Sequence, residues 1–215
     1  MKTLAIKNVK FTSIPGNIPG NLQELYIIDN YITSISCFNN LRKLYLDHNY
    51  ITSIPDSRNL PNNLEELYLD HNQITSIPET GLPNSLQILC LHGNKIISIP
   101  SSLPSNLRIL GLSFNKIVSL PDNFPNNLLK LDLGYNKITS ILCPNNLQEL
   151  YLDHNSITSI PNNLPNSLLK LVLNDNKIKW IIKKLPNKLQ KIYLNNNEIK
   201  YLIYDLPNTL QELHL

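Results

Sequence analysis

Long hydrophobic runs are missing from this sequence. No apolar stretch among its 215 residues approaches the roughly 20 residues that a membrane-spanning helix needs. The amino terminus, MKTLAIKNVKF, interrupts its short apolar run with Lys7, which is not typical of a signal peptide. We therefore expect neither a membrane partner nor export, and we predict an intracellular protein.

Cysteine, aromatic residues and net charge are also scarce. Cys37, Cys90 and Cys143 are too few and too scattered for a disulfide framework, which favours a reducing compartment. Aromatic residues make up only 7% of the chain, but the 42% that is hydrophobic is enough to bury a core. The formal charge of +3 is mild and gives no reason to expect a nucleic-acid partner.

The charge is nevertheless unevenly distributed along the chain. Residues 21–90 carry a net charge of −5, whereas residues 165–204 carry +6. Such an asymmetry can orient a partner during its approach, although surface lysines often serve only solubility.

One asparagine recurs along the chain at intervals of 19 to 23 residues, within the frame LxxLxLxxNxIxxI. The recurring residues are Asn30, Asn49, Asn72, Asn94, Asn115, Asn136, Asn155, Asn176 and Asn197. Val9 takes the Asn slot upstream, and a further copy begins at Leu210 and stops at Leu215. We predict a single domain over residues 1–215 with about eleven units, the first atypical and the last truncated.

Each position of the frame has a physical reason. The LxL alternation predicts a short strand with leucines on one side, and stacked copies predict one parallel sheet. A period near 21 leaves a return too short for a regular helix of ordinary length. An Asn side chain both donates and accepts, so we expect these residues to form a buried structural ladder that satisfies the backbone of each bend.

The returns carry a second signature, LPNNL or a near copy, as at Leu60-Pro61 and Leu164-Pro165. Proline fixes φ and lacks an amide donor, so these segments favour extended backbone. Together the two signatures resemble the leucine-rich repeat family, in particular its short bacterial class. In its Asn-, Ile- and Lys-rich composition the chain is also similar to the leucine-rich repeat proteins of giant DNA viruses of the mimivirus kind, which would imply the host cytoplasm.

The resemblance implies a repeat solenoid, assigned to the α/β class by convention but mostly β. We expect a right-handed arc with one parallel sheet on its concave face and extended, proline-rich returns on its convex face. About eleven strands are expected, and nine of them are placed near residues 24–26, 43–45, 66–68, 88–90, 109–111, 130–132, 149–151, 170–172 and 191–193.

The phrase LYLDHN occurs three times, beginning at Leu44, Leu67 and Leu150. Asp beside His is used by metal sites and by acid/base catalysts, and two neighbouring units bring together Asp47, His48, Asp70 and His71. A metal-binding or enzymatic role at this cluster is one alternative. A copied phrase is the simpler interpretation, because a catalyst needs a unique arrangement, so we expect no metal and no cofactor.

The strand positions that face away from the core form columns on the concave face. Tyr26, Tyr45 and Tyr68 fall in one column on successive strands, and Asp47 and Asp70 fall in the next. Adjacent tyrosines offer contact area and a polar tip, so these five residues are our candidate partner-binding site. Aromatic columns can also serve only to stabilise a sheet, and the sequence leaves both interpretations open.

The cysteines divide into two kinds by their slots. Cys37 and Cys143 take a position that is Leu or Phe in other units, so we expect both to pack as hydrophobes in the returns. Cys90 takes the slot that is Tyr in neighbouring copies. We therefore expect it to be exposed on the concave face and to be the one thiol worth testing for reactivity.

These features favour a non-enzymatic module that binds a protein partner on its concave face. The repeats occupy the whole sequence and leave no room within it for a catalytic domain, so we expect no enzyme. A third alternative is a decoy or structural repeat protein without a single partner, which near-identical copies would fit.

Overall fold

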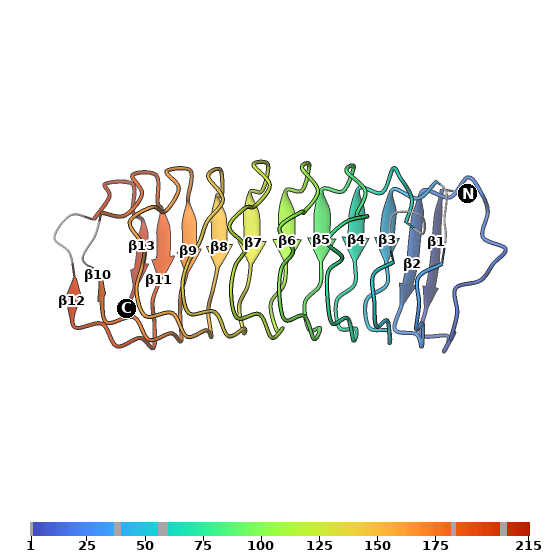
Figure 1. Cartoon of the computed structure of the whole chain (residues 1–215), viewed down its shortest axis with the longest axis horizontal. Helices are drawn as coiled ribbons and strands as arrows, with labels where there is room; N and C mark the ends of the chain where they lie inside the picture. Colours follow the sequence, from blue (N-terminus) through green and yellow to red (C-terminus); the bar gives the residue numbers. More distant parts are fainter. Residues whose placement is uncertain (1, 37–39, 56–59, 182–183, 203–205) are drawn as a thin grey trace.

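The computed structural model describes residues 2–36, 40–55, 60–181, 184–202 and 206–215. It is a solenoid in which one strand from each unit lies beside the strand of the next unit (Figure 1). The main sheet has 11 strands, all parallel, in the order β1-β2-β3-β4-β5-β6-β7-β8-β9-β11-β13. The predicted repeat solenoid is confirmed.

Most strands of this sheet are only three residues long. They are β1 Thr3–Lys7, β2 Glu24–Ile28, β3 Lys43–Tyr45, β4 Glu66–Tyr68, β5 Ile88–Cys90, β6 Ile109–Gly111, β7 Lys130–Asp132, β8 Glu149–Tyr151, β9 Lys170–Val172, β11 Lys191–Tyr193 and β13 Glu212–His214. Every predicted strand position is occupied, and only β2 extends beyond its predicted end. The described residues contain no helix, so none of them forms a helix that could cross a membrane.

A second, smaller sheet was not predicted. β10 (Trp180–Ile181) and β12 (Tyr201–Leu202) pair in parallel in two consecutive returns. Both lie at the end of the solenoid that carries the carboxyl terminus (Figure 1). In the preceding units the corresponding position is Ser, as at Ser140 and Ser159, whereas Trp and Tyr here favour strand pairing.

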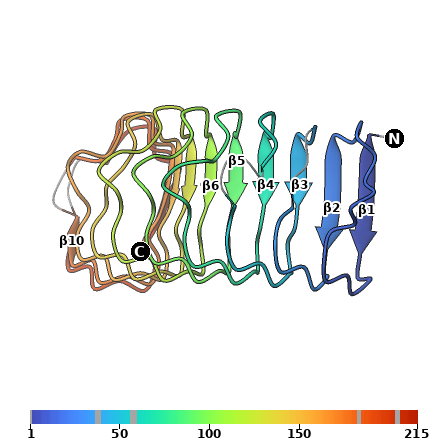
Figure 2. The same ribbon diagram turned by 45° about the vertical axis from the view of Figure 1, so that its right-hand side comes forward.

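The core is a stack of leucines and isoleucines between the sheet and the returns, which form the opposite layer in Figure 2. The strand leucines, for example Leu67, Leu89 and Leu110, are completely buried. Each Pro-Asn-Asn-Leu segment closes a turn, in which the Leu amide donates to the Pro carbonyl, as from Leu64 to Pro61 at 3.1 Å. We use the term concave face for the solvent side of the 11-stranded sheet.

The recurring asparagines lie in the bend that follows each strand. Asn115 accepts the backbone amide of Ile96 at 2.9 Å, and its own amide donates to the Leu91 carbonyl at 2.9 Å and the Leu112 carbonyl at 3.1 Å. Each Asn therefore joins the backbone of its own unit to that of the preceding one. Seven of them are at least nine-tenths buried, and the other two, Asn136 and Asn197, are partly buried with the same pattern of bonds.

The residue before each Asn adopts a left-handed conformation. His48, His71 and Phe114 have φ values of 55°, 53° and 55°. Left-handed backbone is unfavourable for residues other than glycine. It nevertheless turns the chain sharply out of the sheet, which places the next side chain, the Asn, under the bend.

We predict that Asn115→Ala lowers the free energy of unfolding by about 1–3 kcal/mol, because the variant leaves the Ile96 amide buried without a partner. It also removes one of the two donors to the Leu91 and Leu112 carbonyls, which keep only the amides of Asn94 and Asn136. Denaturant unfolding of both proteins measures the difference. Asn84→Ala is the matched control, since the Asn84 side chain is exposed and only its backbone carbonyl accepts a bond. Equal losses in the two variants would contradict a structural role for the buried amide.

Candidate functional site on the concave face

Tyr26, Tyr45 and Tyr68 form a continuous stack on the concave face. The ring centroids of Tyr26 and Tyr45 are 4.2 Å apart with an interplanar angle of 7°. Those of Tyr45 and Tyr68 are 4.5 Å apart with an angle of 8°. Strand register causes this arrangement, because Tyr26 pairs with Tyr45 and Tyr45 with Tyr68 in adjacent parallel strands. The rings cover one another's faces, and all three residues are partly buried.

A charged neighbour holds the Tyr45 hydroxyl in place. The Tyr45 hydroxyl donates to Glu66 Oε2 at 3.1 Å, and Lys43 Nζ lies 2.9 Å from the other oxygen of that carboxylate. Burial, together with the charge of Glu66, raises the pKa of Tyr45 above its ordinary value and that of Tyr68 to about 12. Both phenols are therefore neutral hydrogen-bonding groups at physiological pH.

Asp47 and Asp70 form a second ladder that sequence reasoning missed. Asp47 Oδ1 accepts the backbone amide of Asp70 at 2.8 Å, and Asp70 Oδ1 accepts the amide of His92 at 2.8 Å. His92 continues the series, since its Nδ1 accepts the Ser113 amide at 3.1 Å. The signal was visible in the sequence, because acceptor side chains occupy one slot in consecutive units. Burial raises the pKa of both carboxyls, although the amide bonds that they accept oppose this effect.

The middle of the concave face has no projecting anchor. The ring of His92 lies over Gly111, so close that a Cβ atom there would collide with it. The Asp153 carboxylate likewise lies over Gly134. Absent side chains in one unit thus make room for the side chain of a neighbouring unit. The tyrosine column resumes at Tyr151 and Tyr193, but only the units of β2, β3 and β4 place three tyrosines in one stack.

His48 and His71 stack rather than converge. Their ring centroids are 4.5 Å apart with an interplanar angle of 14°. A zinc ion lies about 2.0–2.1 Å from an imidazole nitrogen, close to the plane of the ring. Two stacked, nearly parallel rings do not direct their nitrogens at one point, so the observed arrangement is not a preformed zinc site. Among the described residues, no three His, Cys, Asp or Glu side chains are grouped to hold a metal.

Cys90 does not have the environment that we expected. It is partly buried beside Tyr68, and burial together with Asp70 and Asp47 raises its pKa to about 12. The expectation of an exposed thiol was wrong. The register of the sheet places the small Cys90 side chain beside the larger Tyr68 side chain of the adjacent strand, which partly covers it. Cys143 packs against the core in a return, and burial raises its pKa to about 12. Cys37 lies outside the described residues.

A third side-chain ladder runs along the opposite edge of the sheet, where the strands begin. In several units the second residue after the turn proline donates to a carbonyl of the preceding unit, as Asn106 Nδ2 does to Asn84 at 2.9 Å and Ser85 Oγ to Asn62 at 2.8 Å. Beside it lies an open polar groove of about 730 Å³, lined among others by Glu65, Gln87 and Arg108. Sequence reasoning assigned LPNNL a role only through its proline and missed this function of the second polar residue.

We predict that zinc does not bind at Asp47, His48, Asp70 and His71 with sub-micromolar affinity, because the two stacked imidazoles do not direct their nitrogens at one point. Isothermal calorimetry with zinc chloride measures this. A sub-micromolar site that disappears in both His48→Ala and His71→Ala would contradict the prediction and support the enzymatic alternative.

We predict that Cys90 reacts with iodoacetamide far more slowly than free cysteine at pH 8, by about a thousandfold. The thiolate is the nucleophile. Raising the pKa of the Cys90 thiol from the ordinary value of 9.0 to about 12 lowers the fraction of thiolate at pH 8 by about a thousandfold. Mass spectrometry of the Cys90 peptide, with cysteine as internal reference, follows the reaction. Equal rates would show that the side chain is not enclosed as described.

Comparison with known proteins supports the fold. No curated protein matches the sequence significantly. YopM from Yersinia enterocolitica WA-314 is 25% identical, with a TM-score of 0.69 over 100% of this chain and 64% of that one. The functional domain of InlJ from Listeria monocytogenes is 21% identical, with a TM-score of 0.73 over 100% of this chain and 55% of that one. The chain thus spans less than two thirds of either protein.

A third similar structure is a chain of the octameric complex of Latrophilin 3, Unc5D and FLRT2, in which FLRT2 is the leucine-rich repeat component. It is 25% identical, with a TM-score of 0.69 over 91% of this chain and 74% of that one. The similarity to giant-virus repeat proteins rests on composition and stays a prediction.

Family patterns match most of the repeats directly. The pattern described as Leucine Rich repeats (2 copies) matches residues 39–79 and 62–105. The pattern described as Leucine Rich Repeat matches residues 106–127 and 146–168. These matches cover more than half of the chain, and their units are the ones that the buried asparagines define. The chain belongs to the leucine-rich repeat family.

Proposed function

We propose that this protein is a non-enzymatic binding module whose concave face engages a protein partner through Tyr26, Tyr45 and Tyr68, with Asp47 and Asp70 beside them. Leucine-rich repeats are commonly protein-interaction modules, and similar structures include a Yersinia pestis protein described as a leucine-rich effector and the FLRT2 component of a receptor complex. We further propose that it acts inside a cell and without a cofactor.

The fixed tyrosine stack is the observation that carries this proposal. Binding through a flexible side chain loses conformational entropy, whereas these rings are already ordered by stacking at 4.2 and 4.5 Å. All three residues keep part of their surface exposed to solvent. Tyrosine is also among the residues that most often dominate the energetics of protein interfaces.

Charge around the stack indicates the kind of partner. Glu24 and Glu66 lie in the column on one side of the tyrosines, and Asp47 and Asp70 lie in the column on the other. Lys43 is already paired with Glu66 at 2.9 Å. A basic or amphipathic protein surface complements this arrangement.

We predict that Tyr45→Ala and Tyr68→Ala each weaken binding of a partner isolated from the native host by at least about tenfold, because truncating an interface anchor typically costs about 2 kcal/mol or more. Surface plasmon resonance with the purified partner measures the affinity. Circular dichroism checks that the variants stay folded. Asn162→Ala is the matched control, since Asn162 is an exposed residue of a return.

Tyr45→Phe separates binding from sheet stabilisation, because it keeps the stack and removes the hydroxyl bond to Glu66. A partner whose affinity ignores all three tyrosines would contradict the proposal. So would a partner that is lost only when Lys179, Lys183 and Lys184 are neutralised; Lys183 lies outside the described residues.

A further inference from the structure

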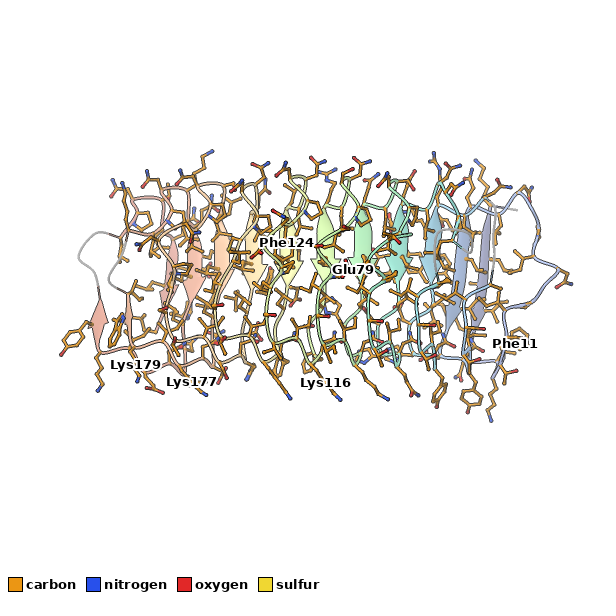
Figure 3. The ribbon with its side chains drawn as sticks, in the orientation of Figure 1. Phe11, Glu79, Lys116, Phe124, Lys177 and Lys179 are labelled. Atoms are coloured by element: carbon orange, nitrogen blue, oxygen red, sulfur yellow. The ribbon has the colours of Figure 1, made fainter. Side chains whose placement is uncertain are left out.

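The rim at the carboxyl ends of the strands carries a row of lysines. The residue after each buried Asn points outward there, and in four of the units it is Lys95, Lys116, Lys137 or Lys177. Lys179 lies two residues beyond Lys177, and Lys200 lies at the equivalent position of the next unit, two residues beyond Glu198. All six are exposed, and we call them the basic rim. Figure 3 shows Lys116, Lys177 and Lys179 projecting along one long edge of the solenoid.

The charge of the basic rim is largely uncompensated. Within the part of the chain that the structure describes, only Lys179 has a carboxylate within 4 Å, that of Glu198 at 3.9 Å. Lys95 donates to the Gln73 side-chain carbonyl at 3.2 Å, which is neutral. In the first unit the same slot holds Lys10, and in the three units between Lys10 and Lys95 it holds Tyr31, Tyr50 and Gln73, so the continuous row begins at Lys95.

Large apolar side chains lie beside these lysines and are exposed. Ile97 and Val118 are 62% and 54% exposed, in a slot that is Thr in several other units. Trp180, the only tryptophan of the chain, is 43% exposed and Tyr201 is 68% exposed. These two face each other in register in the small sheet, so β10 and β12 hold them side by side.

We propose that the basic rim, with Ile97, Val118, Trp180 and Tyr201, docks on the surface of an anionic phospholipid bilayer. Lysines beside the headgroups attract anionic lipids, and their stems allow the charge to stay in the polar layer. Tryptophan and tyrosine favour the interface between headgroups and acyl chains, and exposed aliphatic side chains gain by entering it. Our expectation of no membrane partner considered only spanning segments and export.

Other anionic partners fit the rim less well. A nucleic acid would use the lysines but would leave Ile97 and Val118 in water. An acidic amphipathic peptide needs a hollow, yet the large polar groove lies at the opposite edge of the sheet. A smaller hollow of about 310 Å³ touches the rim only at Lys200 and Tyr201. A projecting row suits a flat surface, and the proposal is independent of the tyrosine site on the concave face.

Trp180 provides the assay, since the chain has no other tryptophan to contribute emission. The full chain is titrated with vesicles of phosphatidylcholine mixed with phosphatidylserine, and with vesicles of phosphatidylcholine alone. We expect a blue shift of the emission and co-sedimentation with the anionic vesicles only, with binding reversed by high salt.

Two sets of variants test the composition of the rim. Lys95→Gln, Lys116→Gln and Lys137→Gln together should weaken vesicle binding at least about tenfold. The matched control is Lys2→Gln, Lys7→Gln and Lys188→Gln, which removes the same charge from exposed positions outside the basic rim and should have little effect. Ile97→Thr with Val118→Thr, which installs the residue of neighbouring units, should weaken binding at least about threefold.

Three outcomes would overturn the proposal. One is equal binding to both kinds of vesicle, and another is an equal loss in the two triple-lysine variants. The third is binding of a single-stranded oligonucleotide or an acidic peptide without any binding of vesicles, which would assign the rim to a different anion. Tyr45→Ala should bind vesicles like the unmodified protein, so failure of this proposal does not bear on the concave face.

Discussion

The structure depends on one interaction, the buried side-chain amide of the asparagine in each bend. It accepts a backbone amide of the preceding unit and donates to carbonyls of both units, as Asn115 does with Ile96, Leu91 and Leu112. Without it the bends would bury unpaired backbone groups, which costs more than the bonds themselves contribute when formed. The left-handed residue that precedes each Asn is the conformational cost of placing that amide.

Because the amide fixes every bend alike, it also fixes the register of all the strands. Equivalent residues of consecutive units therefore lie side by side, and a property of one slot becomes a property of a whole surface. The stacked tyrosines, the Asp47–Asp70–His92 ladder and the basic rim are three results of the same constraint. They differ only in the position of the repeat at which similar side chains recur from unit to unit.

The two proposed surfaces lie on different slots and carry opposite charge. The tyrosine site belongs to the acidic units near the amino terminus, whereas the basic rim begins at Lys95 and extends towards the carboxyl terminus. The concave face and the rim can therefore be occupied at the same time. A protein held at a membrane surface by its rim would still present the tyrosines to a partner.

The sequence by itself determined the repeat, the positions of the strands and the chemistry of the Asn slot, because these follow from local alternation and from one residue type at a fixed spacing. It could not determine what neighbouring units do to one another's side chains. Only the tertiary structure enclosed Cys90, stacked His48 on His71, and paired Trp180 with Tyr201. These outcomes depend on side chains about 20 residues apart in sequence, whose separation and orientation are set by stacking in space rather than by any local pattern.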